Sequence, residues 1–126
     1  MKKAILFSIL AILGLASCQS QSASKGYTDL DVAAFKQKMA EPGVVLLDVR
    51  TPEETAEGKI AANCAEIDFE ADGFEAKIDK LDKDKTYLIY CQGGTRSAQA
   101  SAMMAGKGFK HIYNLTGGYS AWTEGK

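Results

Sequence analysis

Hydrophobic and polar positions divide the chain into an apolar start, a short polar stretch and a long part in which the pattern changes repeatedly. The basic residues Lys2 and Lys3 precede a mostly apolar run over residues 4–15. A membrane-spanning helix needs about 20 such residues, so this run is too short to span and is typical of a signal peptide. The small polar residues 19–26 cannot bury enough surface to fold and are expected to act as a tether.

From residue 27 onward, strand and helix patterns alternate. Continuous apolar runs predict buried strands over residues 44–49 and 86–90, and shorter runs predict strands over 64–67 and 111–114. Apolar residues at helical spacing predict helices after Asp31, after Asp72, over 97–107 and over 119–124. Thr51, Pro52 and Glu54 form a capping box that opens a further short helix, which Gly58 ends. This alternation predicts an α/β domain with a parallel sheet covered on both faces.

Composition narrows the function classes. The 126 residues fit one domain, and 15 basic against 16 acidic side chains leave no basic footprint for nucleic acid. Three cysteines, Cys18, Cys64 and Cys91, are too few and too far apart for a disulfide framework or a closed zinc site. The single histidine, His111, argues against histidine-based catalysis or metal binding.

Two predicted strands end in residues that carry chemistry. The first ends at Asp48 and Arg50, and the second ends at Cys91. Ligands in open α/β sheets bind beyond the carboxyl ends of the strands, so both ends are expected to face one crevice. There, Asp48 and Arg50 either order a loop and attract anions or form an ordinary ion pair.

The loop after Cys91 lies between a predicted strand and a predicted helix. Gly93 and Gly94 allow positive φ, so successive N–H groups can turn inward and form an anion-binding cup at the helix N-terminus. A cysteine sulfur at the centre of such a cup is expected to be a nucleophilic thiolate. Arg96 would brace this loop or hold an anionic substrate. The alternatives are a buried structural cysteine and a glycine turn without a site.

Residues 15–18 resemble the lipobox of bacterial lipoproteins. The resemblance implies that residues 1–17 are removed and that Cys18 is lipidated, so that residues 18–26 tether a domain at 27–126. It also implies export to the bacterial cell envelope, on the periplasmic side in a Gram-negative organism, with membrane attachment by the lipid alone. Gln19 stands where inner-membrane retention uses aspartate, which favours the outer membrane. An ordinary signal peptide and a short membrane anchor are the alternatives.

Three segments resemble the rhodanese, or sulfurtransferase, family. Residues 90–97 are similar to its Cys-x-x-Gly-x-Arg-Ser loop, residues 46–54 to its Asp-x-Arg-x-Pro-x-Glu strand end, and residues 115–122 to its closing Gly-Gly-x-x-x-Trp segment. Residues 58–63 depart from the family's usual Gly-His-Ile-Pro-Gly-Ala. The resemblance implies a five-stranded parallel sheet flanked by helices on both faces.

The same resemblance implies a chemistry. Cys91 would take a sulfane sulfur from a small donor such as thiosulfate or a persulfide, and a thiol or cyanide would collect it. No metal or organic cofactor would be required. The N–H groups that would hold the persulfide belong to the loop residues Gln92, Gly93, Gly94, Thr95, Arg96 and Ser97.

Two other functions are weighed against sulfur transfer. Phosphatases of related fold place one more residue between cysteine and arginine than the four that separate Cys91 from Arg96, so this loop is too small for phosphate. The second is a binding or thiol-relay module with little turnover, working beside a redox protein partner. In that case Cys64 would resolve Cys91, although a small apolar core residue is the simpler interpretation of Cys64.

Overall fold

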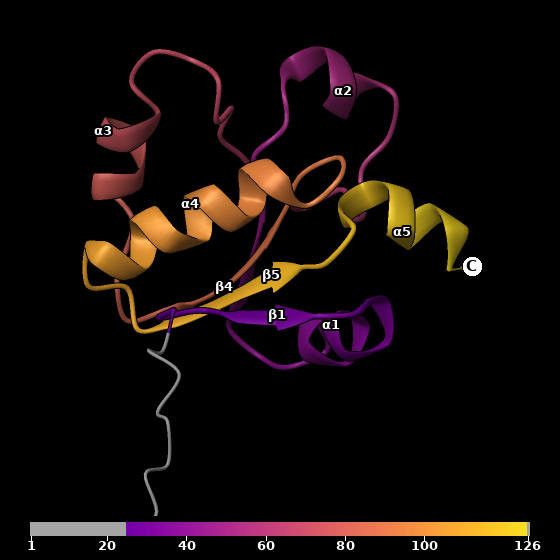
Figure 1. Cartoon of the computed structure of the whole chain (residues 1–126), viewed down its shortest axis with the longest axis horizontal. Helices are drawn as coiled ribbons and strands as arrows, with labels where there is room; N and C mark the ends of the chain where they lie inside the picture. Colours follow the sequence, from indigo (N-terminus) through magenta and orange to yellow (C-terminus); the bar gives the residue numbers. More distant parts are fainter. Residues whose placement is uncertain (1–24, 126) are drawn as a thin grey trace, which may run out of the picture.

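The computed structural model describes residues 25–125, which form a five-stranded parallel sheet with helices on both faces (Figure 1). The sheet has the order β1-β5-β4-β2-β3. The strands are β1 (Thr28–Leu30), β2 (Val44–Asp48), β3 (Ala65–Glu66), β4 (Thr86–Tyr90) and β5 (His111–Leu115). The helices are α1 (Val32–Met39), α2 (Pro52–Ala56), α3 (Phe74–Asp79), α4 (Thr95–Gly106) and α5 (Gly118–Glu124). The predicted α/β fold is therefore confirmed.

Alternation along the central strand β4 divides the core into two clusters. Tyr87, Ile89 and the following Cys91 belong to one cluster, whereas Leu88 and Tyr90 belong to the other. Successive side chains of a strand point to opposite faces, so a central strand covered on both faces must be apolar throughout. The helix residues that complete the clusters are Phe74, Ile78, Ala100 and Met104 on the first face and Phe35 and Trp122 on the second.

The helices begin in two different ways, either with a side-chain cap or after a glycine of positive φ. Asp31 accepts a hydrogen bond from the backbone N–H of Ala34 at 2.8 Å, and the predicted capping box of Thr51 and Glu54 is present. In contrast, α3, α4 and α5 begin after glycines with positive φ, without a side-chain cap. The prediction that α4 starts at residue 97 was therefore wrong by two residues, because Gly94 turns the chain into the helix at once.

The edge strand β1 was not predicted from the hydrophobic pattern. It has three residues and is largely exposed, and it pairs with β5 in a register that places Leu30 beside Leu115. A strand this short carries no readable alternation, so only its pairing with β5 defines it.

The signal peptide and Cys18 lie outside the described residues. Within residues 25–125, no helix combines the length and hydrophobicity needed to cross a membrane.

Replacing Leu88 by alanine should destabilise the domain by about 2–5 kcal/mol, because the fully buried side chain leaves a cavity in the second cluster. Urea denaturation measures this as a lower midpoint at an unchanged slope. Leu81→Ala is the matched control, because Leu81 is only partly buried and should cost clearly less. Equal losses in the two variants would contradict the central position of Leu88.

Candidate active site

The carboxyl ends of β2 and β4 lie side by side and bring the predicted residues together. The Val49 N–H donates to the Tyr90 carbonyl at 3.0 Å, which extends the pairing of these strands to their last residues. Beyond this point, Nη1 of Arg50 donates to Oε1 of Gln92 at 3.2 Å. The two strand ends therefore face one site, as their sequence positions suggest.

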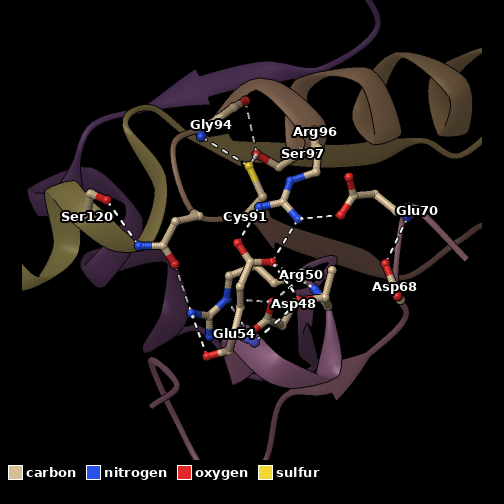
Figure 2. Close-up of polar contacts among 12 residues, drawn as sticks. Asp48, Arg50, Glu54, Asp68, Glu70, Cys91, Gly94, Arg96, Ser97 and Ser120 are labelled. Carbon is tan, nitrogen blue, oxygen red and sulfur yellow. Dashed lines mark hydrogen bonds and ion pairs between the residues drawn. The ribbon is translucent and has the colours of Figure 1, made fainter. Parts of the chain in front are cut away.

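The sulfur of Cys91 lies inside its own loop. The residue is 1% exposed, and Sγ accepts a hydrogen bond from the Gly94 N–H at 3.0 Å, while the Ser97 hydroxyl lies 3.3 Å away (Figure 2). Gly94 adopts a φ of +103°, which turns its N–H inward. The first-turn N–H groups of α4 have no carbonyl partner within the helix, so this end of the helix favours negative charge.

The turn between β5 and α5 packs against the back of the cysteine loop. The Tyr119 N–H donates to the Cys91 carbonyl at 2.8 Å, and the Ser120 N–H donates to the Gln92 carbonyl at 3.1 Å. A Cβ atom at Gly118 would lie 2.5 Å from the Cys91 carbonyl oxygen. Only glycine therefore permits this approach, which fixes the start of the loop from behind.

Arg50 joins the ends of both strands through a buried ion pair. Its guanidinium contacts the Asp48 carboxylate through Nε and Nη2 at distances between 2.7 and 3.1 Å. Nη2 also donates to the Gly58 carbonyl at 2.7 Å, and the guanidinium lies 4.4 Å from the centre of the Tyr119 ring. Arg50 therefore forms the expected ion pair with Asp48 and also, through Gln92, orders the cysteine loop.

Arg96 is held by carboxylates at the side of the loop. Its Nη1 and Nη2 donate to the two oxygens of Glu54 at 2.8 and 2.7 Å, and Nη1 lies 3.3 Å from Glu70 (Figure 2). The hydrogen bonds from Arg96 are the main cause that lowers the pKa of Glu54 to about 2. The same pairing raises the pKa of Arg96. In this structure Arg96 braces the loop against α2.

Gln92, Gly93 and Thr95 make contacts away from the sulfur. The Gln92 side chain donates to Ser120 Oγ at 3.2 Å in addition to its contact with Arg50. Gly93 and Thr95 line a shallow hollow on the outer side of the loop.

Cys64 lies apart from this loop. It packs against the cluster on the other face of the sheet, where the Tyr90 hydroxyl lies 3.9 Å from its sulfur. Burial raises the pKa of the Cys64 thiol, and both described cysteines are free. Among residues 25–125, no group of three His, Cys, Asp or Glu side chains is placed to hold a metal ion.

Comparison with known proteins identifies the family. The rhodanese-like domain matches residues 31–125 of the chain. The chain belongs to the rhodanese-like family. Its similarity therefore extends over the whole sheet after β1 and includes the cysteine loop and the α5 turn.

Relatives of this rhodanese-like chain include sulfurtransferases. A sulfurtransferase of Allochromatium vinosum is 33% identical over 95 residues, which cover 75% of this chain and 86% of the relative. The thiosulfate sulfurtransferase GlpE of Ectopseudomonas mendocina is 31% identical over 86 residues, covering 68% and 76%. A rhodanese-related protein of Thermoplasma volcanium has a crystal structure that superposes with a TM-score of 0.68 at 29% identity, covering 79% of this chain and 93% of the other. At the family level, the chain is a rhodanese-type transferase.

Sequence reasoning missed three residues that shape this rhodanese-like site. The sequence predicts Glu54 only as a helix cap, but its carboxylate also binds Arg96. The signal that could have indicated this second contact is the position of Glu54 in the Pro-x-Glu motif. Gly118 belongs to the closing Gly-Gly motif, which signals a close backbone approach. Glu70 belongs to no recognised sequence motif, and only the fold brings it beside Arg96.

Gly118→Ala should displace the cysteine loop, because the added methyl group would meet the carbonyls of Cys91 and Gln92. Gly43→Ala is the matched control, since Gly43 also has positive φ but has no atom within 4 Å of the position that a methyl group would occupy. Both variants carry the left-handed backbone cost of about 1–2 kcal/mol. Gly118→Ala should lose about 1–3 kcal/mol more through overpacking.

Chemical denaturation measures this difference between the two glycine variants. Amide hydrogen exchange should also become faster at Tyr119 and Ser120 in Gly118→Ala alone, because their N–H groups bond the displaced carbonyls. Equal stability and unchanged exchange would show that the loop tolerates a side chain at Gly118.

The Glu54–Arg96 pair should make stability depend on pH. Because the folded-state pKa of Glu54 is lowered from 4.5 to about 2, its ionised form stabilises the fold above about pH 4.5. This contribution should disappear as the pH falls from 4.5 through 2. The free energy of unfolding of Glu54→Gln should therefore differ most from that of the original protein near neutral pH and approach it in acid. Arg96→Gln should flatten the same pH profile, and a difference that is constant from pH 7 to 2 would contradict the assignment.

Proposed function

We propose that this domain is a sulfurtransferase in which Cys91 carries the transferred sulfur as a persulfide. The observation that carries the proposal is the position of the Cys91 sulfur, which receives the Gly94 N–H inside a loop that continues into the N-terminus of α4. The sequence similarity of this chain to sulfurtransferases supports the same reaction class.

The first half-reaction loads the cysteine. The Cys91 thiolate attacks the outer, sulfane sulfur of thiosulfate, the S–S bond breaks, and sulfite leaves with the bonding electron pair. The negative charge then resides on the new terminal sulfur, one bond beyond Sγ. Inward-facing N–H groups of the loop and the positive end of the α4 dipole stabilise a charge at this place.

The second half-reaction returns the enzyme to its starting state. A nucleophile such as a thiolate or cyanide attacks the terminal sulfur and forms a new bond to it, and Cys91 leaves as the thiolate. Because donor product departs before acceptor binds, the kinetics should be ping-pong. Both half-reactions use the cysteine loop alone. Neither requires an oxidant or a reductant other than the sulfur donor and the acceptor.

We also propose that a lipid on Cys18 attaches the domain to a membrane of the cell envelope. The basic start, the apolar run over residues 4–15 and the position of Cys18 support a lipidated N-terminus. In a parallel sheet, the amino end of β1 and the carboxyl end of β4 lie at opposite ends of the domain. A tether that enters before Thr28 therefore joins the domain at the end opposite the Cys91 loop.

Incubation of the purified domain with excess thiosulfate should add the mass of one sulfur atom at Cys91, and cyanide should remove it. Intact-protein and peptide mass spectrometry measure both steps. Cys91→Ser should take up no sulfur, whereas Cys64→Ser, in which the other described cysteine is changed, should load normally. Uptake that persists in Cys91→Ser would refute the proposal. So would the absence of uptake by the folded and reduced original protein from both thiosulfate and an organic persulfide.

A further inference from the structure

We propose that Glu70, acting with Glu54, sets the donor preference of this site by neutralising Arg96. The preferred donors are organic persulfides that carry at most one negative charge, and doubly charged thiosulfate is disfavoured. This inference rests on the proposed function and concerns the substrate class of the same cysteine loop.

The cation that an anionic donor would meet on this loop is already paired. Arg96 is the fifth residue after Cys91, and its guanidinium donates to both oxygens of Glu54 and to Glu70. Figure 2 shows the Arg96 side chain directed toward these carboxylates, while the Cys91 sulfur points toward Gly94 and Ser97. One positive charge therefore faces two negative charges beside the loop.

The other cationic side chains near the loop also lie among carboxylates. Arg50 is buried and bound to Asp48. Lys59 lies 3.8 Å from Glu66, and Lys77 lines a small hollow together with Glu66 and Asp68. From residue 52 to residue 72, the segment that supplies these carboxylates, the chain contains seven acidic side chains and one lysine. Repulsion of an approaching anion grows with its charge, so thiosulfate is affected more than a singly charged persulfide.

A persulfide donor loads the same cysteine without another reactant. The Cys91 thiolate attacks the outer sulfur of R–S–SH, the S–S bond breaks, and R–S⁻ leaves with the bonding electron pair. The transferred sulfur keeps its hydrogen, so that Cys91 becomes Cys91–S–SH.

Glu70 is the glutamate whose charge can be removed while Arg96 stays bound. Its side chain is 60% exposed and makes one contact with Arg96 at 3.3 Å, whereas Glu54 makes two shorter contacts and also caps α2. Removing the charge of Glu70 therefore leaves Arg96 braced by Glu54 and changes the field around the loop.

The test compares Glu70→Gln with the original domain, using thiosulfate and the persulfide of 2-mercaptoethanol as donors. The rate of sulfur uptake at Cys91 is followed by mass spectrometry as a function of donor concentration. Glu70→Gln should lower the half-saturating thiosulfate concentration roughly three- to tenfold, with little change in the saturating rate, because one repelling charge is removed. For the persulfide the change should stay below about twofold, and added salt should reduce the effect on thiosulfate.

Two further variants separate this charge effect from a structural one. Glu75→Gln removes another exposed glutamate that pairs with Lys107 on the α3–α4 side, and it should leave both donors unchanged. Glu70→Asp keeps the charge and should behave like the original domain. A thiosulfate response in Glu70→Gln equal to that of the persulfide would overturn the donor preference. Failure of both donors to load the original domain would instead overturn the proposed function, and the preference with it.

Discussion

The site depends on one buried charge, the guanidinium of Arg50. It is 2% exposed, and an unpaired charge at this depth would be strongly destabilising. Its partners come from three segments: Asp48 from the end of β2, the Glu54 and Gly58 carbonyls from α2 and the turn after it, and Gln92 from the cysteine loop. Satisfying this one cation therefore fixes three segments relative to each other, and the loop acquires its position as a consequence.

The cysteine loop is held from three directions, and each contact acts on a different part of it. Arg50 binds the Gln92 side chain, the α5 turn binds the carbonyls of Cys91 and Gln92, and α2 holds Arg96 through Glu54. On the inner side of the loop, the Gly94 N–H faces the Cys91 sulfur. In the proposed reaction this contact is in place before a donor arrives, which reduces the cost of organising charge.

Local sequence could predict much of this arrangement, but it could not predict the contacts between distant segments. Short-range rules suffice to predict the buried strands β2 and β4, the capping box at Thr51 and the glycine loop after Cys91. The start of α4 differed from the prediction because Gly94 opens this helix by backbone conformation, and no capping side chain marks the position. The edge strand β1 exists only through its pairing with β5. The contact of Arg96 with Glu70 joins the loop to the segment between β3 and α3, and the sequence around either residue does not indicate the other.

The alternation of side chains along β4 also separates Cys91 from Cys64. Tyr90 and Cys91 are adjacent, so their side chains enter opposite clusters, and the Tyr90 hydroxyl lies against Cys64. The sheet therefore stands between the two thiols, and Cys64 cannot approach Cys91 while β2, β4 and their cores stay packed. In the proposed reaction, a persulfide on Cys91 would therefore lie out of reach of Cys64. The acceptor of the proposed reaction would then come from outside the domain, and the carboxylates around Arg96 would act on its charge as well.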